Sequence, residues 1–183
     1  AARSAHWSGD VRAWLAHAAE IGVGAVGVSC RGPQGLLRDA GWLMDRDGSC
    51  VPIAHGMGAD THGYYGQLSL AHGASALDGA VVALRLQSID TRAPGLCLKA
   101  GWRMVWTPVA TVVENWEAFM PYQPSQEREA PTLVMSANAA QAASSANGGY
   151  ADPAYSPHLC DRHGDHRLAP NGPQLYAPKA RTR

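Results

Sequence analysis

Residues 96–113 constrain the fold more than any other stretch of the chain. They read Leu-Cys-Leu-Lys-Ala-Gly-Trp-Arg-Met-Val-Trp-Thr-Pro-Val-Ala-Thr-Val-Val. The leading Leu-Cys-Leu predicts the apolar end of a short helix, and Gly101 supplies the left-handed residue that commonly closes one. Residues 104–106, Met-Val-Trp, form a short apolar run typical of a buried strand. Pro108 limits how far that strand can donate to a ladder. We therefore expect a helix end, a glycine stop and a central β-strand.

The composition is that of a folded domain with no charge preference. The chain has 183 residues and is 46% hydrophobic, enough for one domain with a sizeable core. Lys plus Arg equals Asp plus Glu at 15 each, so no basic excess points to nucleic acid or an anionic membrane surface. No apolar run approaches the roughly 18 residues of a membrane span, and no signal peptide is recognised.

Four cysteines are scattered through the chain without a CxxC pair: Cys30, Cys50, Cys97 and Cys160. This spacing predicts free thiols in a reducing compartment. The expected location is the cytoplasm, and the alternative is peripheral attachment to the inner face of the membrane. The first residue is Ala1 rather than Met, which favours a fragment of a longer protein.

The first half of the chain carries an amphipathic helix and several short strands. Residues 11–19 place apolar side chains on one helical stripe. Ser8 is the expected N-cap, and Asp10 suits the first turn. Residues 23–30 predict an apolar strand. A turn follows, and then two apolar runs, residues 36–44 and 50–55, flank an Asp-Gly step, which is a strong hairpin signal.

The second half begins with one more core strand and becomes irregular. Residues 74–85 predict a single strand, and residues 86–94 a loop. Residues 132–147 are rich in Ala, Ser and Asn and favour at most a weak helix. Residues 148–183 contain many prolines and few large apolar side chains, so we expect an irregular tail.

In this order the stretches resemble the late part of family-two nucleotide-sugar glycosyltransferases. "VGAVGVSCRGPQGLLRDAGWLM" is similar to the family's Val-Gly-x-Val-Gly strand and Pro-x-Gly turn. "PIAHGMGADTHGYYGQLSLAHGASALDGAVVALR" is similar to its flexible loop and next strand. "ADPAYSPHLCDRHGDHRLAP" is similar to its closing Asp-Pro-x-Tyr-x-Pro-x-Leu stretch. The resemblance covers residues from about Val11 to Pro170.

The resemblance implies an α/β fold: a partial Rossmann-like, GT-A-type mixed sheet with flanking helices and an irregular C-terminal tail. Its boundaries divide the chain into an acceptor-side part at residues 8–116, a polar linker at 117–147 and a Pro-rich tail at 148–183. The implied activity is transfer of a sugar from a nucleotide-sugar donor to a glycan or lipid-linked acceptor, with Mg²⁺ or Mn²⁺ expected for the full-length family.

Several family features have no match in this sequence. The nucleotide-binding half with its metal-binding Asp-x-Asp is missing, so no cofactor is expected in this chain. The catalytic base of the family aligns with Gly95, preceded by Pro94. An inverting transfer needs a carboxylate that takes the acceptor proton, and Asp90 is the only carboxylate nearby. Asp90 is therefore one candidate catalytic residue.

A second set of candidates follows from position. Asp78 and Gly79 lie at a predicted strand end, where substrates of α/β sheets usually bind, and the alternative role for Asp78 is a turn or cap. His55, His62 and His72 flank one loop. His55 is the candidate acceptor-binding residue, and solvated loop histidines are the alternative.

Other patterns favour structural roles. Asp45-Arg46-Asp47 lies in a hairpin turn, where Asp and Gly serve the backbone. The Cys160-x-x-His163-x-x-His166 spacing is not a standard zinc pattern. Trp102 and Trp106 are typical of core packing.

The sequence thus predicts a glycosyltransferase-like protein that is inactive as this isolated chain. The alternative is a non-catalytic binding or assembly module that retains the acceptor-side scaffold. A small metal-binding protein using the Cys160 cluster is a weaker third hypothesis.

Overall fold

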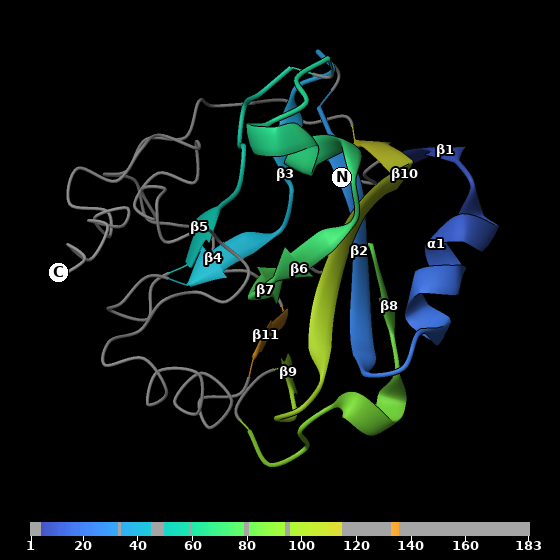
Figure 1. The fold of residues 1–183 in the computed structure, drawn as a ribbon, viewed down its shortest axis with the longest axis vertical. Coiled ribbons are helices and arrows are strands. Elements are labelled where there is room, and N and C mark those ends of the chain that lie inside the picture. Colours follow the sequence, from blue (N-terminus) through green and yellow to red (C-terminus); the bar gives the residue numbers. More distant parts are fainter. Residues whose placement is uncertain are drawn as a thin grey trace, which may run out of the picture.

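The structure, a computed structural model, describes residues 5–32, 34–44, 50–58, 60–78, 81–93, 96–114 and 133–135. In these ranges the chain is mixed α/β, consists mostly of strands and contains one α-helix (Figure 1). The elements in chain order are β1 Ala5–Gly9, α1 Val11–Ala19, β2 Val23–Arg31, β3 Leu37–Asp39, β4 Trp42–Met44, β5 Cys50–Pro52, the 3₁₀ turn η1 Tyr64–Ser69, β6 His72–Ala74, β7 Ala76–Leu77, β8 Val82–Leu84, the 3₁₀ turn η2 Leu86–Ser88, β9 Leu96–Leu98, β10 Arg103–Glu114 and β11 Leu133–Met135.

The first sheet is built on two long parallel strands, β2 and β10. The strands β6 and β1 pair with the other edge of β10, and β8 and β3 pair with the other edge of β2. All four flanking strands run antiparallel to the strand that they join. The two parallel strands therefore form the centre of a mixed sheet, as expected for residues 23–30 and 104–106.

Strand β10 continues past Pro108, although its pairing with β2 shifts there. The register moves between Thr107 and Thr111, because proline has no N–H to donate to the ladder. The backbone N–H of Val109 instead bonds to Thr107 Oγ1 at 3.4 Å. Pro108 thus disturbs the pairing of β10 only locally, and the strand runs to Glu114.

The second sheet has the strand order β5-β4-β7-β11-β9. Strands β4 and β5 form the antiparallel hairpin that the sequence predicts, with Trp42 opposite Pro52 and Met44 opposite Cys50. Strand β11 lies between β7, to which it is antiparallel, and β9, to which it is parallel. This sheet therefore joins segments from distant parts of the chain.

Both faces of the first sheet are buried, because the side chains of its central strands point alternately to one face and to the other. Val26 and Val105 face α1, where Trp14 and Ala18 pack against them. Their neighbours face the second sheet and belong to the largest apolar cluster, which includes Ala25, Met104, Trp106, Leu43, Ile53, Leu77, Leu98 and Leu133. Since successive strand side chains point to opposite faces, α1 and the second sheet cover the two faces of the central pair.

Helix α1 covers the residues that the sequence predicts, but the expected N-cap, Ser8, lies in β1 instead. Asp10 is the N-cap, and its Oδ1 accepts from the N–H groups of Arg12 and Ala13 at 2.8 and 3.2 Å. The apolar stripe is only partly buried, because Val11 and Leu15 remain 42% and 48% exposed. None of the described helices has the length and apolar character that a membrane span requires.

Two predicted elements are wrong, and a third can be compared only at its start. Residues 96–98 form strand β9 instead of a helix end, because they pair with β11. The single strand predicted over residues 74–85 is divided: β7 joins the second sheet, and β8 joins β2 in the first. Of residues 132–147, which favour at most a weak helix, Leu133–Met135 is a strand and the rest lies outside the described residues. The hairpin turn at residues 45–48 and the tail at 148–183 lie outside the described residues.

Candidate functional site

The chain passes from the first sheet to the second through four residues, Arg38 to Gly41, which we call the joint. Strand β3 pairs with the end of β2, with Asp39 opposite Cys30. Gly41 then adopts the left-handed φ of 85° that leads into β4. Asp39 Oδ1 accepts the Gly41 N–H at 3.0 Å, as Asp side chains commonly do in turns. The Asp-Ala-Gly sequence thus forms a tight connection between the sheets.

An ion pair joins the joint to the strand end where Asp78 was expected to bind substrate. Arg38 Nη2 lies 2.5 Å from Asp78 Oδ2, and the two side chains are only 16% and 14% exposed. A guanidinium this close to a carboxylate makes a strong, directional ion pair that fixes the orientation of both side chains. The geometry therefore gives Asp78 a structural partner from a different strand.

Asp39 is a buried carboxyl with one unsatisfied oxygen. The residue is 4% exposed, and within the described part of the chain its Oδ2 has no hydrogen-bond partner. Burial, followed by the nearby charge of Asp78, raises the pKa of Asp39 to about 7, against the opposing effects of the Gly41 N–H, Arg38 and Trp42. Trp42 lies near the carboxyl, but its Nε1 makes no well-directed hydrogen bond there. Asp39 is thus a proton-holding group close to neutral pH.

Two of the three loop histidines predicted from the sequence bind the same joint. His55 Nδ1 donates to the Arg38 carbonyl at 2.6 Å. The ring of His72 packs against Trp106 with centroids 5.0 Å apart. His72 Nε2 lies 2.9 Å from the Ala40 carbonyl, and its Nδ1 faces two further carbonyls at 3.2 and 3.3 Å.

His72 is held mainly as the neutral imidazole. Burial lowers the pKa of His72, although the surrounding carbonyl oxygens act in the opposite direction. A neutral ring carries one N–H and can donate from only one side at a time. We use "joint cluster" for Arg38, Asp39, His55, His72 and Asp78. His62, by contrast, contacts Ser69 Oγ at 2.9 Å in an exposed position.

Asp90, the other candidate catalytic residue, is not in the joint cluster. Its Oδ1 accepts the Arg92 N–H at 3.0 Å, and its own N–H donates to the Cys97 carbonyl at 2.8 Å. The preceding η2 is bound to Gly24 near the start of β2, whereas the joint follows the end of β2, about 20 Å away along an extended strand. In Figure 1 the loop after η2 lies at the bottom, below β3 and β4. The two candidate catalytic carboxylates are therefore not brought together.

Gly79, the other candidate substrate-binding residue, lies outside the described residues, as do Gly95 and the Cys160 cluster. Within the described ranges, no three His, Cys, Asp or Glu side chains are grouped so that they could hold a metal ion.

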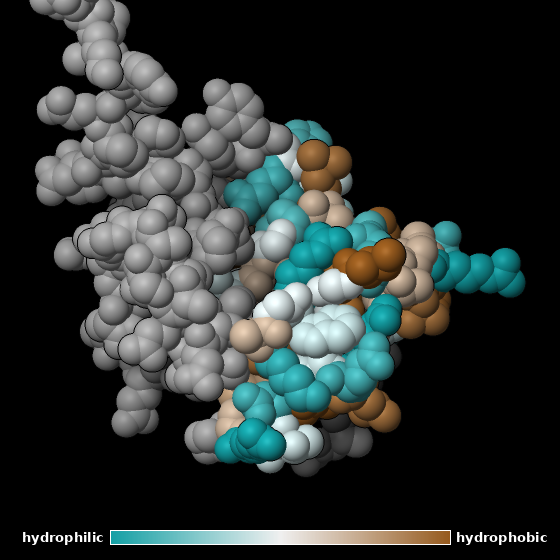
Figure 2. Space-filling model, turned by 60° about the horizontal axis from the view of Figure 1, so that its bottom comes forward, coloured by the Kyte–Doolittle hydropathy of each residue, from teal (hydrophilic) through white to brown (hydrophobic). Residues whose placement is uncertain are grey.

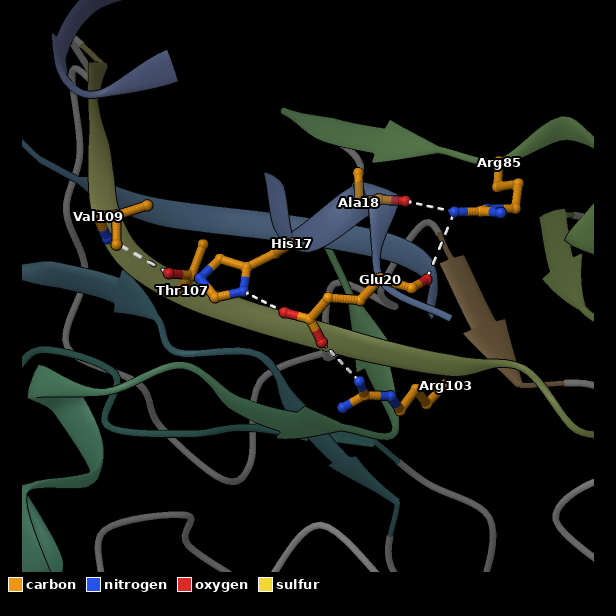
Figure 3. Close-up of polar contacts among 7 residues, drawn as sticks. All are labelled: His17, Ala18, Glu20, Arg85, Arg103, Thr107 and Val109. Carbon is orange, nitrogen blue, oxygen red and sulfur yellow. Dashed lines mark hydrogen bonds and ion pairs between the residues drawn. The ribbon is translucent and has the colours of Figure 1, made fainter. Parts of the chain in front are cut away.

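A second polar network, which the sequence did not suggest, lies at the end of α1 (Figure 3). Glu20 Oε1 lies 2.7 Å from His17 Nδ1, and Glu20 Oε2 lies 2.6 Å from Arg103 Nη2. The His17 hydrogen bond, with Arg103 adding to it, lowers the pKa of Glu20. Arg85 Nη2 donates to the Ala18 carbonyl at 2.8 Å and stacks over Trp102. Cations at a helix C-terminus are stabilising, so this network anchors α1 to β8 and β10.

Sequence reasoning also missed Arg38 and Asp39. Their signal was an Arg-Asp pair inside the apolar run of residues 36–44. Such a pair must be exposed or partnered, because unpaired buried charges are costly. The partner of Arg38 follows a strand far along the chain, which local patterns do not reveal.

Comparison with known proteins found no match: no protein-family model, no curated protein and no solved structure corresponds to this chain.

Proposed function

We propose that the chain is a glycosyltransferase-like scaffold that binds on the acceptor side and does not transfer sugar by itself. The observation that carries the proposal is the parallel pairing of β2 with β10 at the centre of the first sheet. Both stretches belong to the ordered series that resembles the family, and residues 104–106 match the last central strand of the family's catalytic sheet.

The contacts of the candidate bases support a non-catalytic role. A general base must offer a free carboxylate oxygen within about 2.6–3.2 Å of the acceptor hydroxyl. Asp78 is paired with Arg38 at 2.5 Å, so its Oδ2 is already engaged by a guanidinium. Asp90 accepts a backbone N–H of its own turn. Both carboxylates thus make structural contacts within the protein, and they lie near opposite ends of β2.

A second candidate function is an assembly module beside an active transferase. The exposed apolar side chains of α1 favour it: Val11 and Leu15 on the helix are 42% and 48% exposed, and Ile21, just after it, is 96% exposed. On the face seen in Figure 2, hydrophobic residues lie in separate small groups between hydrophilic ones. This arrangement suits a weak contact better than an obligate interface.

Titration calorimetry tests the proposal. The purified chain is titrated with UDP, GDP and TDP, each with and without Mn²⁺, and separately with oligosaccharides that represent glycan acceptors. The proposal predicts measurable glycan binding and no nucleotide binding at micromolar concentrations. Micromolar binding of any nucleotide would contradict it, because a donor site would then be present in this chain.

A further inference from the structure

The joint holds the two sheets together through a small set of hydrogen bonds. The Ala40 N–H donates to the Ile53 carbonyl at 2.9 Å, and the Ile53 N–H donates to the Gly41 carbonyl at 2.9 Å. Close by, His72 of β6 contacts the Ala40 carbonyl and His55 the Arg38 carbonyl. The joint is therefore the point at which β3, the β4–β5 hairpin and β6 are fixed relative to one another.

The Asp39 carboxyl lies at the centre of the joint, and only one of its two oxygens accepts a hydrogen bond among the described residues. Oδ1 accepts the Gly41 N–H at 3.0 Å, which fixes the turn. Oδ2 is buried and has no partner among the described residues. A neutral carboxyl still accepts the Gly41 N–H, although less strongly than an ionised one, whereas an ionised Oδ2 in this position leaves negative charge without a donor.

The charged and titratable groups around Asp39 come from every neighbouring element. Arg38 on β3 and Asp78 after β7 form one ion pair. Cys30 and Arg31 lie on the paired part of β2. His72 of β6 and His55 after β5 reach the backbone on either side of Asp39. The Arg38 charge is already shared with Asp78, so a second carboxylate at Asp39 competes for it.

We propose that the joint is a proton-responsive hinge between the two sheets, closed when the Asp39 carboxyl is protonated and loosened when it ionises. This inference is independent of the proposed function. The proton resides on Oδ2, and its loss to solvent breaks no hydrogen bond to Gly41. The new carboxylate repels Asp78 and draws Arg38 away from it, which weakens the attachment of β4 and β5 to the first sheet. Burial and the Asp78 charge, which hold the pKa of Asp39 near 7, put this change close to neutral pH.

Hydrogen–deuterium exchange of the full chain at pH 5.5 and pH 8.5 tests the proposal, after correction for the intrinsic pH dependence of exchange. In peptides covering residues 37–44 and 50–57, protection is expected to fall by on the order of tenfold or more at pH 8.5, since each unit of pKa difference corresponds to tenfold in an equilibrium. Peptides covering α1 and residues 104–107 are expected to change much less.

Two variants identify the group responsible. Asp39→Asn removes the titrating carboxyl and retains His55 and His72, so the fall in protection at pH 8.5 is expected to disappear from its exchange profiles. Asp90→Asn removes the same formal charge from the other end of β2 and is expected to behave like the unmodified chain. A fall in protection at pH 8.5 that survives in Asp39→Asn, or equal protection of the unmodified chain at both pH values, overturns the proposal.

A direct titration keeps the proposal testable if Asp39→Asn fails to fold. In the unmodified chain labelled with [¹³Cγ]Asp, one aspartate carboxyl is expected to titrate far above the 3.8 of an ordinary Asp. Its midpoint is expected to coincide with the midpoint of the exchange change in residues 37–44. If every aspartate titrates near the ordinary value, the hinge assignment is wrong.

Discussion

Arg38 and Asp78 form an ion pair with an Nη2–Oδ2 distance of 2.5 Å, although they come from β3 and from the segment after β7. The pair joins the first sheet to the second next to the buried carboxyl of Asp39. Its position makes the Arg38 charge the main compensation for two carboxylates, so the joint depends on it.

Replacing Arg38 by Met is expected to lower the free energy of unfolding by about 3–5 kcal/mol at pH 8, because removal of one partner leaves mostly buried carboxylates without compensation. Urea denaturation measures the change. Arg92→Met is the matched control, since the Arg92 side chain is exposed, and it is expected to change stability by no more than about 0.5 kcal/mol. Equal midpoints for the two variants would show that the ion pair contributes nothing.

The stability of the chain is expected to depend on pH through Asp39. The pKa of Asp39 is raised from 3.8 to about 7 in the folded state, so the folded state binds the proton more tightly than the unfolded state does. The resulting stability is complete below about pH 3.8 and is lost as the pH rises toward 7. The burial that lowers the pKa of His72 acts oppositely, and its contribution is lost as the pH falls below 6.5, the ordinary pKa of a histidine.

A difference between two proteins isolates the Asp39 contribution. The unfolding free energy of Asp39→Asn minus that of the unmodified chain is expected to increase from pH 4 to pH 7. The contribution of His72 is present in both proteins and cancels from this difference. Urea midpoints at four pH values give this difference. A constant difference across the range would mean that the Asp39 carboxyl titrates alike in the folded and unfolded states.

Local sequence patterns predicted the centre of the fold. Strands at residues 23–30 and 104–106, the helix at 11–19 and the hairpin flanks depend on apolar periodicity and turn residues, and all are present. The Leu-Cys-Leu run was ambiguous, because three apolar residues fit a helix end or a strand. Its partner, β11, lies far along the chain, so tertiary pairing decided its structure.

The candidate site was predictable only in part. Asp78 and His55 were selected by position, and both are found at the joint. The joint itself was missed, since it depends on Arg38 and Asp39 contacting residues from three other elements. No local spacing encodes such contacts.

Gly41 is expected to be much less tolerant of substitution than Gly101. Both have a left-handed backbone, with φ of 85° and 86°. A Cβ at Gly41 would lie 2.7 Å from the Ala74 Cβ, whereas a Cβ at Gly101 meets no atom within 4 Å. Gly101→Ala is expected to cost about 1–2 kcal/mol from backbone strain alone, and Gly41→Ala clearly more. Thermal or urea unfolding of the two variants checks this, and similar costs would mean that the joint moves freely to admit the methyl group.

Trp106→Ala is expected to destabilise the chain severely. Trp106 is 1% exposed on the central strand β10 and packs against His72. Replacing a buried aromatic residue by Ala costs about 3–5 kcal/mol, a large part of the stability of a small domain. Trp102→Ala, at the partly buried rim, is the comparison and is expected to cost less. An unchanged melting curve for Trp106→Ala would contradict the central position of β10.

The most direct test of the proposed function is donor turnover by the isolated chain. UDP-, GDP- and TDP-sugars are incubated with the protein, with Mn²⁺ and an acceptor glycan present, and sugar transfer and donor hydrolysis are followed by mass spectrometry. Asp78→Asn and Asp90→Asn are measured in parallel. The account predicts no turnover above the protein-free reaction for any of the three proteins. Turnover by the unmodified chain that Asp78→Asn or Asp90→Asn abolishes would contradict it and make that carboxylate a catalytic residue.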